Sequence, residues 1–99
     1  MGVKFKIYEV ILENGEGRNV NSQSFLYAEY EDAVSKFKKL IEERKKVDWI
    51  MECLNIIDTH EGYDIDLIQT MDLWAIYVGD VGDFHHMNSR VKIIEREVF

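Results

Sequence analysis

The chain has 99 residues, of which 46% are hydrophobic and 31% charged, and its formal net charge is −7 at pH 7. This composition excludes a disordered chain and suffices for one hydrophobic core, so we expect residues 1–99 to form a single compact domain. The negative net charge argues against direct binding to nucleic acid or to anionic membrane surfaces.

The negative charge is concentrated in the second half of the chain. Residues 1–46 contain nine basic and eight acidic residues, whereas residues 47–99 contain three basic and eleven acidic residues. Neither a signal peptide nor a membrane-spanning stretch is indicated by the apolar runs. Cys53 is the single cysteine and stands among apolar residues. We therefore expect an inert core thiol and a cytoplasmic protein.

The first part of the chain predicts a β-hairpin. Residues 3–12 alternate in polarity and then become almost entirely apolar, as in a strand that is half-buried at its start. Asn14-Gly15 follows directly and indicates a hairpin turn, because both residues tolerate positive φ. The polar run over 18–22 predicts a connection longer than two residues, with the return strand over 23–28.

Residues 31–46 carry the most regular pattern and predict an amphipathic helix. The apolar residues recur with the 3.6-residue period and form one stripe, made of Ala33, Val34, Phe37, Leu40 and Ile41. Arg44 is the single interruption of this stripe. We expect this apolar stripe to be the side of the helix that packs on a sheet.

Residues 47–57 allow two interpretations. As a strand they would place Glu52 among apolar neighbours, which is costly without a partner. As a helix they collect Asp48, Glu52 and Asn55 in one polar stripe, and we favour the helix for this reason. A helix unbroken from residue 31 would be too long for the domain, so we expect a break near 46–48, with Asp48 as the N-cap of the second helix.

The rest of the chain predicts strands. Ile65 and Leu67 alternate with aspartates in a half-buried strand, and residues 73–78 are apolar on both faces, as in the most buried strand. Between these strands a bulge around residues 70–72 competes with a tight hairpin. Residues 79–90 are predicted to be a polar loop. Residues 91–99 are predicted to be a final strand at an edge of the sheet.

These elements together predict an α+β fold. We expect a small antiparallel sheet, built from the N-terminal hairpin and two or three C-terminal strands. One or two helices, over 31–46 and 48–57, would pack on one face of this sheet.

The segment 79–90 contains the residues closest in character to a metal site, which are Asp80, Asp83, His85 and His86. Carboxylates and imidazoles bind zinc, manganese or iron, but this spacing matches no zinc pattern. We therefore expect no metal and no cofactor. A small-ligand or metal-binding domain that uses the 58–66 turn together with this loop is the alternative interpretation.

No residues have the arrangement that catalysis requires. Cys53 has no neighbouring positive charge that would lower the pKa of its thiol, and no serine stands in a nucleophile-elbow context. We therefore expect a protein that is not an enzyme.

The aspartates of the second half give the most specific prediction. Asp64 and Asp66 lie on the same face of the predicted strand, about 6.6 Å apart. Asp72 would extend this row if the strand continued. A rigid row of carboxylates can dock on a basic protein surface and steer association with it.

We therefore expect a non-catalytic acidic interaction module whose partner is a basic, nucleic-acid-handling protein. In general character, without a shared motif, it is comparable to the small inhibitory proteins of phages and mobile elements. A structural or regulatory subunit that forms a homo-oligomer through apolar surface around Trp49 and Trp74 is a further alternative.

Overall fold

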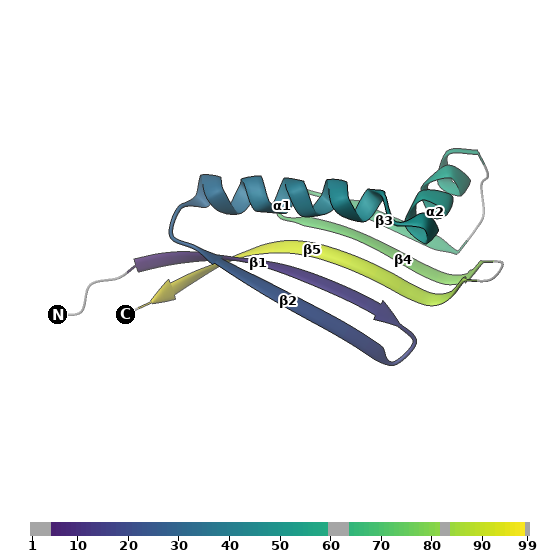
Figure 1. The fold of residues 1–99 in the computed structure, drawn as a ribbon, viewed down its shortest axis with the longest axis horizontal. Coiled ribbons are helices and arrows are strands. Elements are labelled where there is room, and N and C mark those ends of the chain that lie inside the picture. Colours follow the sequence, from purple (N-terminus) through teal and green to yellow (C-terminus); the bar gives the residue numbers. More distant parts are fainter. Residues whose placement is uncertain (1–4, 60–63, 82–83, 99) are drawn as a thin grey trace.

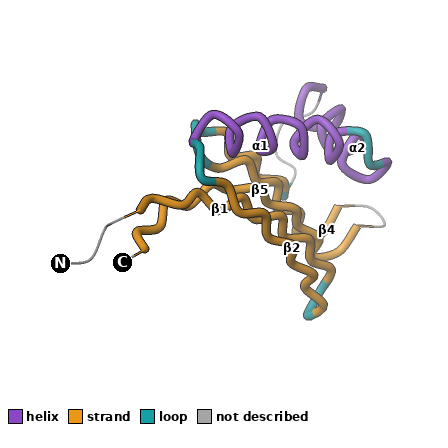
Figure 2. The backbone as a smooth tube through the Cα atoms, turned by 60° about the vertical axis from the view of Figure 1, so that its left-hand side comes forward, coloured by secondary structure: helices purple, strands orange, loops and turns teal. Residues whose placement is uncertain are grey.

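The computed structural model describes residues 5–59, 64–81 and 84–98. It contains a five-stranded antiparallel sheet with two helices packed on one face (Figures 1 and 2), which confirms the predicted α+β class. Within these residues, no helix is long and apolar enough to cross a membrane.

Seven elements follow one another along the chain. They are β1 (Phe5–Glu16), β2 (Asn19–Tyr27), α1 (Tyr30–Lys45), α2 (Asp48–Thr59), β3 (Ile65–Gln69), β4 (Leu73–Val81) and β5 (Phe84–Val98). The strand order in the sheet is β2-β1-β5-β4-β3, so the edges are β2 and β3. The two helices connect one edge of the sheet to the other (Figure 1).

β5 lies in the centre of the sheet, between β1 and β4. The prediction of a loop over 79–90 is therefore wrong, because these residues include the end of β4 and the first half of β5. The prediction of an edge strand over 91–99 is also wrong, since Val91 pairs with Leu12 of β1 and Trp74 of β4. Polar residues are tolerated in this central strand because one face of the sheet carries no helix, as in many antiparallel sheets.

The first hairpin turns at Gly17-Arg18 and not at Asn14-Gly15. Glu16 pairs with Asn19, and Gly17 adopts a φ of 59°, which suits a glycine in a tight turn. Gly15 lies instead inside β1, where a Cβ would come within 2.7 Å of the side-chain Nδ2 of Asn88 on β5, so a larger residue would displace that side chain. The return strand consequently starts at Asn19, earlier than predicted.

A tight hairpin joins β3 and β4, so the bulge around residues 70–72 is not formed. The Thr70 backbone N–H donates to the Leu73 carbonyl at 2.8 Å, and the Leu73 N–H donates to Thr70 Oγ1 at 3.0 Å. Thr70 thus supplies, through its side chain, part of the turn chemistry for which glycine or asparagine is more usual.

Both helices form where they were predicted. α1 buries Ala33, Phe37 and Leu40 from the predicted stripe, and α2 confirms the helical interpretation of 47–57 and the break before it. The N-cap assignment was wrong by one residue. The Val47 carbonyl accepts the Met51 N–H at 2.9 Å, and Asp48 lies in the first turn, where its charge complements the helix dipole.

Arg44 interrupts the apolar stripe because it bonds to the sheet. Its Nε donates to Ser89 Oγ at 2.9 Å, and the Ser89 hydroxyl donates to Asn14 Oδ1 at 2.6 Å. Ser89 is completely buried in β5. This chain of hydrogen bonds ties α1 to β5 and β1 through polar groups that would otherwise be buried without partners.

The core lies between the helices and the sheet. Its buried residues come from every layer of the fold and include Val10, Leu12, Phe37, Leu40, Ile50, Cys53, Trp74, Ile76, Val78 and Val91. The predicted most buried strand is confirmed in β4, where Trp74, Ala75, Ile76 and Val78 are all buried. Cys53 is fully buried, and this burial raises the pKa of its thiol, as expected for an inert core cysteine.

Candidate functional site

The face of the sheet opposite the helices, called here the open face, carries a network of ion pairs. Glu13 contacts Arg90 Nη2 at 2.6 Å and Lys92 Nζ at 3.0 Å, and Glu9 contacts Arg96 Nε at 2.7 Å. These three cations are all the basic residues of 47–99. Every basic residue of the acidic half is thus paired with a glutamate from the first half of the chain.

Hydrogen bonds keep this network charged. The hydrogen bond from Lys92 is the main reason why the pKa of Glu13 is lowered, and the charge of Arg90 adds to it. The pKa of Glu9 is lowered by the hydroxyl of Ser24 and by Arg96. Both glutamates therefore stay ionised to a lower pH than an ordinary glutamate does.

A hollow of about 350 Å³ lies beside this network, toward the end of the sheet where β4 turns into β5. It is lined by Gly17, Asp64, Asp66, Tyr77, Val78, Gly79, His86, Met87 and Asn88. Strand register brings these residues together, because Asp66 pairs with Tyr77, Tyr77 with Asn88, and Asn88 with Gly15. Alternation along the strands directs Asp66, Tyr77 and Asn88 to the open face, since their neighbours Leu67, Ile76 and Met87 pack on the core.

Gly79 makes room for the Asp64 carboxylate. A Cβ at position 79 would overlap this carboxylate, and the Gly79 N–H donates to the Asp64 carbonyl at 2.9 Å. Asp64 therefore lies across the backbone of β4 instead of extending away from it. The close approach requires glycine at position 79.

The turn between β1 and β2 closes another side of the hollow. The Gly17 N–H donates to the His86 carbonyl at 3.1 Å, and His86 has a φ of 52°, in the left-handed region that few residues other than glycine adopt. His86 is exposed at this point. The hydrogen bond links the first hairpin to the start of β5 and so fixes the shape of the hollow.

The structure brings two of the three predicted partner-binding residues together. Asp64 and Asp66 are both exposed and both line the hollow. Asp72 is not part of their row, because β3 ends at Gln69 and Asp72 lies in the turn beyond it. Its carboxylate there accepts the Thr70 hydroxyl at 2.9 Å.

The weak metal candidates do not gather into one described cluster. Asp80 pairs with His85 across the β4–β5 ladder, whereas His86 lines the hollow with Asp64 and Asp66. Asp83 and most of the 58–66 turn lie outside the residues whose side chains are described. Within the described part, no group of three or more His, Cys, Asp or Glu residues could hold a metal ion.

Sequence reasoning missed the residues that surround the two aspartates. Tyr77 looked like part of an apolar strand, and Gly17, Gly79 and Asn88 looked like turn or loop residues. The one usable signal was Gly79, which directly follows the apolar run over 73–78. The register of β5 against β1 and β4, which assembles the hollow, has no local signature.

Comparison of the chain with protein families, curated proteins and solved structures found no match. The hollow itself is therefore the basis for inferring a function.

Proposed function

We propose that the protein is a non-catalytic acidic interaction module, and that Asp64 and Asp66 bind a lysine or arginine side chain of a basic partner protein. The observation that carries this proposal is the pairing of Arg90, Lys92 and Arg96 with Glu9 and Glu13. No internal cation of the acidic half is left for the two aspartates. Among the described residues, neither of them makes an ion pair.

The chemistry of the hollow fits a long cationic side chain. Two carboxylates can accept several N–H groups of a guanidinium or ammonium, and the ring of Tyr77 offers a surface for the aliphatic stem. The net charge of −7 would steer a basic protein toward this site. A protein with a basic groove for nucleic acid is the partner with the most suitable surface.

The specific form of this proposal is an inhibitor that occupies such a groove, as small acidic proteins of phages and mobile elements do. The free, buried Cys53 is consistent with the cytoplasmic setting of this proposal, because cytoplasmic proteins rarely depend on disulfides.

The proposal is tested by titrating isotope-labelled protein with an arginine-rich peptide and following backbone amide shifts by NMR. We expect saturable shifts around Asp64, Asp66 and Gly79, and a steep loss of affinity as salt is added. The double variant Asp64→Asn/Asp66→Asn should weaken binding about tenfold and flatten the salt dependence, because the two charges that would pair with the peptide are removed.

Glu31→Gln/Asp32→Asn is the matched control. It removes the same charge from exposed residues in the first turn of α1, at the other end of the molecule (Figure 1). We expect it to bind the peptide almost as wild type does. If both double variants lose affinity equally, the attraction comes from net charge alone and the site is not the one proposed.

Self-association is a second candidate function, and the outer edge of β2 favours it. Residues 19–28 contain no charged residue and no proline, and β2 is exposed along most of its length. Edge strands usually carry charged residues or proline, which prevent pairing with another chain. The prediction that Trp74 contributes apolar surface for self-association is wrong, because this residue is only 2% exposed.

A further inference from the structure

The outer edge of β2 is the longer of the two free edges of the sheet. β2 pairs with β1 on one side and with no described strand on the other, and residues 19–24 are all exposed. Figures 1 and 2 show that β2 diverges from α1 toward its hairpin turn, so that neither helix covers this edge. The backbone N–H and C=O groups along it are therefore available to another strand.

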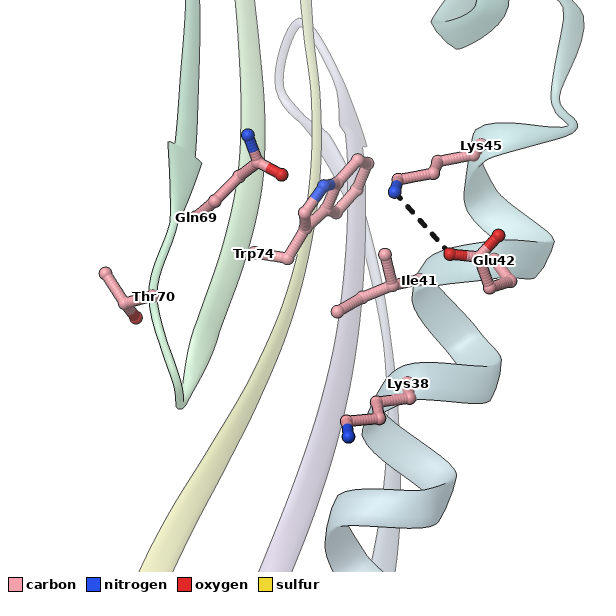
Figure 3. Close-up of a pocket in the computed structure, with 7 residues that line it drawn as sticks. All are labelled: Lys38, Ile41, Glu42, Lys45, Gln69, Thr70 and Trp74. Atoms are coloured by element: carbon pink, nitrogen blue, oxygen red, sulfur yellow. Dashed lines mark ion pairs between the residues drawn. The ribbon is translucent and has the colours of Figure 1, made fainter.

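The opposite edge of the sheet is better protected. β3 has only five residues, and one of them is the exposed Asp66. Gln69 at its end shares a cavity of about 400 Å³ with Ile41 and Lys45 of α1, so side chains of the helix lie beside the end of this strand (Figure 3). A strand added at β3 would be short and would meet a charge, whereas β2 offers nine residues without one.

The hairpin turn determines which residues of β2 present their backbone to the outer edge. The residues that close a two-residue turn are hydrogen-bonded to each other, and here they are Glu16 and Asn19. From Asn19 onward, every second residue therefore bonds to β1, and the residues between them direct their N–H and C=O groups outward. These outward residues are Val20, Ser22, Ser24 and Leu26.

A second copy of β2 can pair with these residues in an antiparallel register that sets outward residues opposite one another. The register centred on Gln23 places Val20 of one copy opposite Leu26 of the other. It also places Ser22 opposite Ser24, and the whole strand takes part. The two neighbouring registers, centred on Ser22 or on Ser24, shorten the ladder and place an apolar residue opposite a serine. β2 is thus self-complementary in the register centred on Gln23.

The side chains also fit this register. Val20 and Leu26 are 58% and 64% exposed in the single copy, and their pairing across the strands would cover apolar surface of both. Ser22 and Ser24 can exchange a hydroxyl hydrogen bond. β2 itself carries no charge although the net charge of the chain is −7, so two copies can approach at this edge with less repulsion than elsewhere.

We propose that two copies of the protein join through β2 in this register and form one continuous antiparallel sheet, with five strands from each copy. The two-fold axis passes perpendicular to the sheet beside Gln23, because directly opposed residues of antiparallel strands point to the same face. Both open faces, each with its Asp64 and Asp66, therefore lie on one side of the dimer. This inference rests on the second candidate function, self-association, and adds to it the register and the arrangement of the two acidic hollows.

Disulfide trapping tests the register. Directly opposed residues at the axis have Cα atoms about 4.5 Å apart, which a disulfide can bridge. In a glutathione redox buffer, Gln23→Cys should form a disulfide-linked dimer about tenfold faster than Ser22→Cys or Ser24→Cys. In the latter two variants the equivalent Cα atoms of the two copies are about 8 Å apart, beyond the reach of a disulfide. The wild type, whose Cys53 is fully buried, should remain unlinked.

A mixture of Ser22→Cys and Ser24→Cys provides a second test, because these two positions lie opposite each other in the proposed register. The mixture should form a disulfide-linked heterodimer much faster than either variant forms a linked homodimer. All three substituted positions are exposed, so the substitutions should leave the fold intact.

Sedimentation velocity of the wild type at two concentrations separates the register from self-association itself. A concentration-dependent dimer, together with the fastest disulfide formation in Gln23→Cys, supports the proposal. A dimer in which Ser22→Cys or Ser24→Cys links fastest, or in which all three variants link equally fast, overturns the register and leaves self-association standing. A wild-type protein that remains monomeric, with no more linked dimer in Gln23→Cys than in the wild type, overturns both.

Discussion

Glu13 is the residue on which the charges of the open face converge. Both of its carboxylate oxygens are engaged, one by Arg90 and the other by Lys92, and its side chain is only 16% exposed. Ion pairs on open surfaces contribute little to stability, but a carboxylate this well covered has few water molecules to replace its partners. Glu13 is therefore the member of the network whose removal should matter most.

We predict that Glu13→Gln lowers the free energy of unfolding by about 1–3 kcal/mol at neutral pH. The pKa of Glu13 is lowered in the folded protein, so the unfolded chain takes up its proton first as the pH falls. The stabilisation is consequently complete above about pH 5 and is lost as the pH falls through the folded pKa.

Urea denaturation of the wild type and of Glu13→Gln, at pH 7 and near pH 3, measures the two free energies of unfolding. The difference between these free energies should be smaller at the acidic pH. Glu16→Gln, an exposed residue of the same strand, should change stability by less than about 0.5 kcal/mol at either pH. An equal difference at both pH values would contradict the assignment.

At the scale of the elements, the two edge strands differ in how they are protected. β3 has five residues and carries Asp66, whereas β2 has nine residues without a charge. Short, charged edges resist pairing with other chains, and long uncharged ones favour it. Pairing through the uncharged β2 edges would also not bring the acidic surfaces of the two copies together, so their repulsion would be small.

We predict that the wild-type protein dimerises through β2 as its concentration rises, and that Gln23→Lys prevents this. Residue 23 is exposed in the middle of β2, so two centred antiparallel strands would bring the two lysines side by side. Sedimentation velocity at two concentrations measures the effect.

Ser35→Lys is the control for this experiment, because it adds the same charge to an exposed position on α1. It should dimerise as wild type does. A wild-type protein that stays monomeric at both concentrations, or a Gln23→Lys variant that still dimerises, would rule out the β2 interface.

At the scale of the whole molecule, the first and last strands of the chain are neighbours. β1 pairs with β5 from Phe5↔Val98 to Glu16↔Met87, and β5 pairs on its other side with β4. The centre of the sheet therefore depends on contacts between residues far apart in sequence. Such contacts form only when most of the chain has been ordered.

We predict that backbone amides of β5 around Val91 exchange with deuterium most slowly. This strand is hydrogen-bonded on both sides and is joined to α1, and Val91 is fully buried, so its exchange requires global unfolding. Amides on the outer edge of β2 should exchange much faster. Mass spectrometry or NMR measures both in one experiment, and equal protection of β5 and β2 would contradict the strand order.

The sequence by itself determined the elements whose pattern is local. The 3.6-residue period of 31–46 and the polar stripe of 47–57 follow from helix geometry, and the alternation around Ile65 and Leu67 follows from the pleat of a strand. The acidic imbalance and the shared face of Asp64 and Asp66 were also present in the sequence. Together these features were enough for the α+β class and for half of the candidate site.

Only the tertiary structure decided the strand order and, with it, the surroundings of the aspartates. Asn14-Gly15 has the composition of a turn, but both residues pair with β5 inside β1, and the turn forms at Gly17 instead. The polar residues after Gly79 have the composition of a loop, but β1 and β4 pair with them on both sides. Local composition gives no information about such partners, because register is set by side chains that meet across strands. The hollow at Asp64 and Asp66 exists because that register brings Tyr77, Gly79 and Asn88 to the same place.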